Sequence, residues 1–257
     1  LVGSEMCIRD RLSAIRGVTE NIVVVLAGGA VVEMPWIGET KALLNSYLGG
    51  EASGSAVTDI LFGDVNPSGK LAETYPFSLE DTPCYNNFPG HTATVEYREG
   101  LYIGYRYYDT AKKNVLFPFG FGLSYTSFEL FDKTVMEADD RIIVSVKVRN
   151  VGSAAGKEVI EVYYGAPQGE LGKAAKSLAA YEKTRTLLPG EEQRVVVSFP
   201  CANMASFDDS GKSGAAFCYV LEAGDYPIYA GTDVRSCEQI GVHTCLLYTS
   251  PSPRDRG

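Results

Sequence analysis

The pattern of apolar positions divides the chain into a first part of mixed segments and a second part of short strands. Residues 22–26 (IVVVL) form a continuous apolar run, typical of a strand buried on both faces of a parallel sheet. Apolar residues from 34 to 48 fall near helical spacing, and Gly49 and Gly50 end that predicted helix. A second helix is predicted over 54–62. A strand followed by helices indicates a layered α/β domain.

The segment behind the second helix completes this first domain. The helix residues expected to face inward are Ala56, Val57, Ile60 and Leu61. Residues 63–69 are dense in turn-forming residues, and residues 71–75 predict a short strand. Residues 76–95 predict a long surface loop, which could border a ligand site or simply wrap the domain.

An aromatic-rich connector, residues 99–130, links the two parts. Nine Phe and Tyr residues lie between Tyr102 and Phe128. We expect them to be buried at a domain junction, because each such side chain removes about 150–250 Å² from water.

The second part has the pattern of an all-β sandwich. Residues 142–150 alternate apolar and polar side chains, which predicts a half-buried strand. Further strands are predicted at 159–164, 176–183, 194–199, 217–222 and 226–230. About seven short strands separated by turns are typical of an immunoglobulin-like or fibronectin type III-like sandwich. The predicted fold is an α/β layered domain over 12–126, followed by an all-β sandwich over 127–244.

The two ends of the chain, 1–11 and 245–257, resemble translated sequencing-library adapter. The DNA string AG-ATG-TGT-ATA-AGA-GAC-A encodes residues 6–10, and its reverse complement encodes residues 245–250. One inverted sequence thus accounts for both ends, and we exclude them from fold prediction. With both ends foreign, the compartment stays open between cytoplasm and secretion.

The charge balance argues against two classes of partner. The chain has 23 Lys and Arg against 32 Asp and Glu, a net charge of −9. Without the two ends, which hold four arginines and three acidic residues, the net charge is −10. Nucleic-acid binding needs a basic footprint, and a membrane span needs about 20 consecutive apolar residues, which no segment approaches. We expect neither nucleic acid nor membrane as a partner.

The cysteines and glycines suggest no metal or nucleotide cofactor. Between the two ends, the cysteines are Cys84, Cys201, Cys218 and Cys237. They form no C-x-x-C pair, and the only histidines are His91 and His243, so no zinc site is expected. Cys201 and Cys218 flank one loop and could form a disulfide, although free thiols are favoured. Residues 63–71 miss the spacing of a nucleotide-binding phosphate loop by one residue. The dinucleotide-binding pattern G-x-G-x-x-G is absent after 22–26, and the serine-hydrolase pattern G-x-S-x-G is absent throughout the sequence.

Several segments combine Gly, Pro and aromatic residues in a recognisable order. They are 32–37 (VEMPWI), 63–71 (GDVNPSGKL), 97–100 (YREG) with 104–109 (GYRYYD), and 117–120 (FPFG) with 122–126 (GLSYT). These segments resemble the C-terminal half of family 3 glycoside hydrolases, which are β-glucosidases and relatives such as β-xylosidases. Segments 150–152, 155–159 and 188–191 are similar to the fibronectin type III-like domain of those enzymes. The resemblance covers residues 20–242, with a departure at Phe121, where the family usually has His or Tyr, and a weak match at 179–183.

The resemblance implies a retaining β-glycosidase whose catalytic carboxylates lie outside this chain. Such enzymes use two carboxyl groups about 5–5.5 Å apart. The nucleophilic aspartate belongs to a separate (β/α)₈ barrel domain, and the acid/base glutamate lies upstream of the strand at 22–26. We therefore expect this chain to hold no catalytic residue, to need no cofactor and to be inactive alone. In the parent enzyme it would contribute a wall of the pocket for a glycoside substrate, and its sandwich domain would support that structure.

Three acidic residues within the motifs are candidates for chemistry, but structural roles are favoured for them. Glu33 precedes a predicted helix and could interact with its dipole. Glu99 or Asp109 could pair with Arg98 or Arg106.

A non-catalytic carbohydrate-binding or scaffold module is the alternative. It would present exposed rows of Trp or Tyr, whereas the single tryptophan, Trp36, is predicted to be buried. The sugar, its linkage, the domain order and the oligomeric state stay open.

Overall fold

The computed structural model describes residues 10–90, 94–214, 216–246 and 248–250. The chain divides into two compact units, Leu1–Val65 with Tyr75–Asp81 and Asn66–Thr74 with Thr82–Gly257. The ends attributed to adapter lie largely outside the described residues, as does His91. The predicted domain limits stay a prediction.

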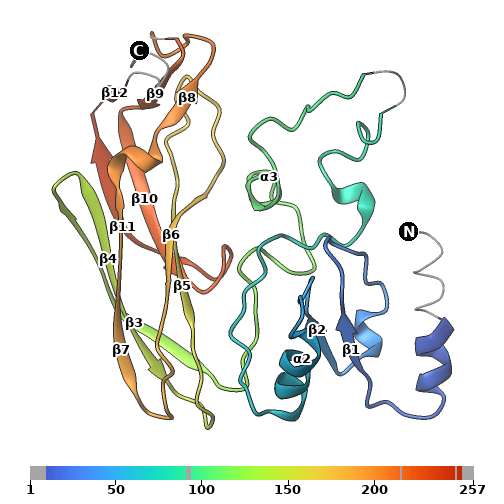
Figure 1. The fold of residues 1–257 in the computed structure, drawn as a ribbon. Coiled ribbons are helices and arrows are strands. Elements are labelled where there is room, and N and C mark those ends of the chain that lie inside the picture. The colour runs from blue at the N-terminus through green and yellow to red at the C-terminus, as the bar shows by residue number, and fades with distance from the viewer. Residues whose placement is uncertain (1–9, 91–93, 215, 247, 251–257) are drawn as a thin grey trace. The chain divides into compact units, whose positions relative to one another are not determined.

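The first unit contains a two-stranded parallel sheet, the helix α2 and a further helical segment over residues 10–16 (Figure 1). β1 (Val23–Leu26) pairs in parallel with β2 (Ala42–Asn45), and α2 (Ser53–Phe62) follows. Two short 3-10 turns, η1 (Ile37–Glu39) and η2 (Leu79–Asp81), lie in the connections. Gly63 ends α2 in the left-handed conformation that glycine adopts most readily. The strand at 22–26 and the helix at 54–62 are thereby confirmed.

The predicted helix over 34–48 is wrong. Only η1 is helical, and Thr40 behind it is already extended, with φ −114° and ψ 150°. The remainder forms β2, because hydrogen-bonded pairing with β1 outweighs a helical spacing that its short apolar run satisfies only loosely. Trp36 is buried as predicted, but it lies in a turn ahead of η1. Residues 71–75, predicted as a strand, form none.

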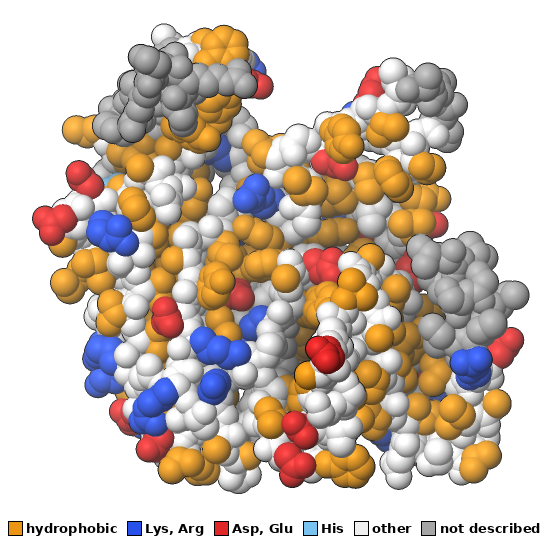
Figure 2. Space-filling view, in the orientation of Figure 1, with side chains coloured by type: hydrophobic (Ala, Val, Ile, Leu, Met, Phe, Trp, Pro, Cys, Tyr) orange, Lys and Arg blue, Asp and Glu red, His pale blue; other side chains and the backbone are white. Residues whose placement is uncertain are grey.

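Burial in the first unit is also less than predicted. Val23 is 52% exposed and Val25 40%, so β1 is not buried on both faces. No residue of α2 is buried, although Val57 and Ile60 are partly covered. Figure 2 shows hydrophobic side chains at the surface over α2, where Leu61 and Phe62 are exposed. The apolar side chains of β1 and α2 are therefore less covered by neighbouring residues than the sequence predicts.

The second unit is built around two antiparallel sheets (Figure 1). One sheet has the order β3-β4-β7, with β3 (Phe128–Ala138), β4 (Arg141–Asn150) and β7 (Glu192–Pro200). The other has the order β11-β10-β5-β6, with β11 (Glu238–Cys245), β10 (Gly224–Gly231), β5 (Val159–Tyr164) and β6 (Ser177–Lys183). A small third sheet contains β12 (Tyr248–Ser250), β9 (Cys218–Leu221) and β8 (Ser206–Asp208). In the described part of this unit, the helical segments are α3 (Tyr105–Thr110) and η3 (Cys201–Met204).

The core of this unit lies between the two larger sheets. Burial along β4 alternates strictly, with Val144, Val146 and Val148 fully buried. They belong to one cluster with Ile160 of β5 and Ile228 of β10. This alternation is the pattern that the sequence predicts, and the all-β sandwich is confirmed. β3, β8 and β11 were not predicted, nor was β12, which lies in the end attributed to adapter.

Two further findings bear on the sequence predictions. Cys201 and Cys218 are both free thiols in the structure. Among the described residues, no helix combines the length and apolar character needed to span a membrane.

Candidate functional site

Two of the three acidic candidates, Glu33 and Asp109, have structural partners. The carboxylate of Glu33 accepts a hydrogen bond from the Leu79 amide within the first unit. In the second unit, the guanidinium of Arg98 pairs with Glu96. The pairing of Glu99 with Arg98 or Arg106 stays a prediction. Asp109, predicted to pair with Arg98 or Arg106, instead pairs with the distant Arg235.

The Asp109–Arg235 pair ties α3 to the turn after β10. Arg235 Nε lies 2.9 Å from Asp109 Oδ1, and its Nη2 donates to the Lys113 carbonyl at 2.7 Å. Burial raises the pKa of Asp109 above its ordinary value, although Arg235 acts in the opposite direction. The geometry is that of a structural ion pair.

Two of the motifs that carry the family resemblance converge on Asn66 within the second unit. Its Oδ1 accepts hydrogen bonds from Ser124 Oγ and from the Tyr125 amide, both at 2.9 Å. Its Nδ2 donates to the Ala155 carbonyl at 2.8 Å. One side chain of the 63–71 motif therefore fixes both the 122–126 motif and the turn ahead of β5.

Lys70 makes the second link between the same segments. Its Nζ lies 2.9 Å from Glu158 Oε1 and 3.4 Å from the Gly122 carbonyl, and both charged side chains are mostly buried. A Cβ on Gly122 would lie 2.4 Å from the Gly69 carbonyl oxygen, so the close approach of these two backbones requires glycine. The residue that corresponds to a phosphate-loop lysine is thus held by a carboxylate.

A buried carboxyl group lies behind this link. Glu161 of β5 is only 5% exposed, and its Oε2 accepts a hydrogen bond from the Tyr163 hydroxyl. Burial raises the pKa of Glu161 to about 7, against the opposing effects of Tyr163 and Lys70. A carboxyl group with such a pKa could transfer protons near neutral pH. Its burial keeps substrate away, however, which favours a structural role.

Gly120 covers this carboxyl group. Its φ is +83°, and a Cβ there would lie 2.3 Å from Glu161 Oε2. We expect Gly120→Ala to lower the free energy of unfolding by at least about 2 kcal/mol, because left-handed strain adds to the clash. Denaturant unfolding followed by circular dichroism measures this value.

Gly190→Ala is the matched control. Gly190 has nearly the same φ, +82°, but nothing lies within 4 Å of the position its Cβ would take. It should therefore show only the strain of about 1–2 kcal/mol. Equal destabilisation by the two substitutions would show that Gly120 is not needed to accommodate Glu161.

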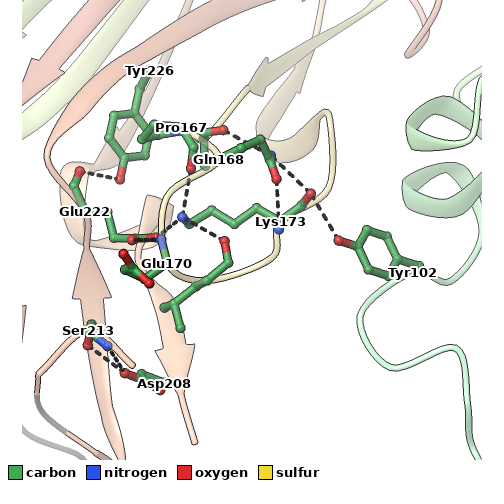
Figure 3. Close-up of polar contacts among 11 residues, drawn as sticks. Tyr102, Pro167, Gln168, Glu170, Lys173, Asp208, Ser213, Glu222 and Tyr226 are labelled. Atoms are coloured by element: carbon green, nitrogen blue, oxygen red, sulfur yellow. Dashed lines mark hydrogen bonds and ion pairs between the residues drawn. The ribbon is translucent and has the colours of Figure 1, made fainter. Parts of the chain in front are cut away.

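A second buried polar cluster surrounds Lys173 in the segment between β5 and β6 (Figure 3). The Lys173 ammonium pairs with Glu222 behind β9 and donates to the carbonyls of Pro167, at 2.8 Å, and Leu171, at 3.3 Å. The side chains of Lys173 and Glu222 are 4% and 9% exposed. Glu222 Oε1 also accepts the Glu170 amide at 2.7 Å. This loop is therefore organised around one buried ion pair.

The electrostatics of the pair follow from these contacts. Burial alone would raise the pKa of Glu222, but the Lys173 ammonium and the Glu170 amide outweigh it and hold that pKa below its ordinary value. The backbone of Lys173 is also bound: Gln168 Nε2 and the Tyr102 hydroxyl donate to its carbonyl at 3.2 and 3.5 Å. The aromatic connector thus contacts this loop.

Sequence reasoning did not identify either buried cluster. Lys173 and Glu222 are 49 positions apart in the sequence, and no sequence motif contains both. Glu161 had a detectable signal, since it is an acidic residue inside the apolar run of β5. An acid in such a run points to a buried carboxyl group whose pKa is shifted.

Comparison with protein families matches both parts of the chain. Residues 8–125 match the glycosyl hydrolase family 3 C-terminal domain, and residues 158–234 match the fibronectin type III-like domain. The chain is 46% identical to thermostable β-glucosidase B of Acetivibrio thermocellus, over 87% of this chain and 29% of that protein. It is 40% identical to a β-glucosidase of Ruminococcus albus, over 98% of this chain and 26% of that protein.

Solved structures give the same result. The crystal structure of a β-glucosidase from Paenibacillus barengoltzii is similar with a TM-score of 0.88 and 40% identity, over 95% of this chain and 28% of that one. The β-glucosidase from Kluyveromyces marxianus in complex with glucose has a TM-score of 0.85 and 34% identity, over 96% of this chain and 29% of that one. The chain spans less than a third of these relatives. It belongs to glycoside hydrolase family 3, of which it carries the C-terminal domain and the fibronectin type III-like domain.

Proposed function

We propose that this chain is the C-terminal part of a retaining β-glucosidase that removes terminal β-linked sugars from oligosaccharides or glycosides. The observation that carries the proposal is the joint match to both family domains, at 26–29% of the length of β-glucosidases. In this reading the chain supplies no catalytic carboxylate. It supports a barrel domain that contains the nucleophile.

The first unit supports this reading on physical grounds. Parallel sheets occur almost only with both faces covered, yet β1 and β2 form a parallel pair with exposed valines. A pair of this kind is expected at the margin of a larger sheet. The missing apolar neighbours would come from the remainder of the α/β domain.

A domain replacement tests the proposal. The segment of A. thermocellus β-glucosidase B that this chain matches is replaced by residues 12–244, and hydrolysis of p-nitrophenyl β-D-glucoside is measured. We expect the chimera to release p-nitrophenol and the chain alone to release none. The control is the same chimera with its nucleophilic aspartate changed to Asn, which reports contaminating activity.

Two results would contradict the proposal. One is p-nitrophenol release by the purified chain above a mock preparation. The other is a folded chimera that is no more active than its Asp→Asn control.

The alternative, a carbohydrate-binding module, has one observation in its favour. Phe207 of β8 and Tyr219 of β9 are exposed cross-strand neighbours with ring centroids 5.3 Å apart. Their planes are inclined at 64°, however, so they present no common flat face to a sugar. Affinity electrophoresis on soluble glucans distinguishes the readings: we expect unretarded migration, and retardation that Tyr219→Ala abolishes would favour the module.

A further inference from the structure

Three potential metal ligands meet where the two large sheets of the second unit have their free edges. β3 is the edge strand of one sheet and β11 is the edge strand of the other. Glu137 lies near the end of β3, His243 lies on β11, and Cys201 begins η3 directly behind β7. These residues are 42 and more positions apart in sequence, so only the fold brings them together.

The ligand atoms of the three side chains are close to one another. His243 Nδ1 lies 2.7 Å from Glu137 Oε2, and these atoms and Cys201 Sγ all lie within 4.8 Å of one another. The His243 side chain is only 7% exposed, Cys201 is partly buried, and Glu137 reaches the site from the solvent side. Imidazole, thiolate and carboxylate are the ligand types that zinc accepts in proteins.

The backbone around the site is well fixed. His243 lies opposite Tyr226 in the β10–β11 pairing, and the Cys201 amide donates to the Asp140 carbonyl at 2.8 Å. A Cβ on Gly241 would lie 3.0 Å from Val135 Cβ, so glycine on β11 permits close approach to β3. The Lys133–Glu238 ion pair joins the same two strands. A cation would therefore bind between β3 and β11, which these contacts already hold together.

We propose that Glu137, Cys201 and His243 form a zinc site that joins the two edge strands of the sandwich. A tetrahedral zinc ion with bonds of 2.0–2.3 Å places its ligands about 3.5 Å apart. The His243–Glu137 hydrogen bond must lengthen by about 1 Å, and Cys201 Sγ must move closer. The exposed Glu137 side chain can make this adjustment. On binding, the Cys201 thiol releases its proton to water, and a water molecule completes the four ligands.

A site at this place would cross-link the edge strands of the two sheets, β3 and β11. An ion held by one residue from each sheet and one from η3 would stabilise the folded state by mass action, because the unfolded chain does not hold the three ligands together.

The experiment uses the full chain, freed of metal by dialysis against a chelator. Cobalt(II), a spectroscopic substitute for zinc, is titrated while thiolate-to-metal absorption in the near ultraviolet is recorded, and zinc content is measured after gel filtration. We expect one equivalent of metal, a thiolate band, and a rise in Tm with zinc. Cys201→Ser should abolish the band, and His243→Gln should weaken binding at least about 100-fold, since even groups that only hydrogen-bond to a metal ligand contribute about 10–100-fold.

Two control variants show whether metal binding depends on any cysteine other than Cys201. Cys84→Ser should change nothing, because Cys84 is a free thiol outside the sandwich strands. Cys245→Ser should also leave binding intact, although Cys245 on β11 lies in the segment attributed to adapter. Circular dichroism confirms that each variant is folded.

Four outcomes would overturn the proposal. The first is that the chain binds no metal, which would leave His243 and Glu137 as a plain hydrogen-bonded pair. The second is metal binding without a thiolate band, and the third is unchanged binding in folded Cys201→Ser. The fourth is loss of binding in Cys245→Ser, which would place the site on the terminal segment.

Discussion

Lys173→Met is expected to lower the free energy of unfolding of the second unit by about 3–5 kcal/mol. The substitution keeps the length of the side chain but leaves the Glu222 carboxylate buried without its cation. It also removes the donor to the carbonyls of Pro167 and Leu171, which together shape the loop between β5 and β6. Guanidinium unfolding followed by circular dichroism gives the value.

Lys157→Met is the matched control, because Lys157 is an exposed lysine in the same unit. It should change the free energy of unfolding by less than about 0.5 kcal/mol. The double variant Lys173→Met/Glu222→Leu should be more stable than Lys173→Met alone, since no unpaired charge then remains buried. A loss below about 1 kcal/mol in Lys173→Met would show that water reaches Glu222 and that the pair is not buried in solution.

The sandwich strands could be predicted from sequence because each carries its own signal. β4 alternates at every position, so its inward face can be read without knowledge of its partners. The helix predicted over 34–48 failed for the opposite reason. Whether the apolar residues of β2 form a strand depends on its pairing with β1, and nothing local encodes that pairing.

The polar clusters are even less visible in the sequence. Asn66 could be placed in a motif, but its partners Ser124 and Ala155 are 58 and 89 positions away. The contacts of Lys173 depend on a loop that has no regular periodicity. Cys201 and His243 lack the short spacings that mark zinc motifs, because their proximity comes from the way the two sheets pack.

We predicted no pair of catalytic carboxylates in this chain, and the reason differs from those above. The resemblance to family 3 implies that the nucleophile and the acid/base residue lie in segments outside this chain, which stays a prediction. Two acidic residues within its motifs have structural partners: Glu33 binds the Leu79 amide, and Asp109 binds Arg235. These contacts favour structural roles for Glu33 and Asp109 over catalytic ones.

Glu161 should make the stability of the second unit fall as pH rises. Its pKa is about 7 in the folded chain and near the ordinary 4.5 when unfolded, so the folded state binds the extra proton between these values. Its stabilising contribution is complete below pH 4.5 and is lost as pH rises through 7. A shift of this size corresponds to about 3 kcal/mol.

Glu161→Gln removes this titration while it preserves the shape of the side chain and an oxygen that can accept from Tyr163. We expect the difference in unfolding free energy between pH 5 and pH 8 to be about 2.5 kcal/mol smaller in Glu161→Gln than in the unmodified chain. Glu182→Gln is the control, because Glu182 is exposed on the neighbouring β6 and should leave the pH dependence unchanged. A pH dependence that survives in Glu161→Gln would mean that another group titrates, and that Lys70 keeps Glu161 ionised at neutral pH.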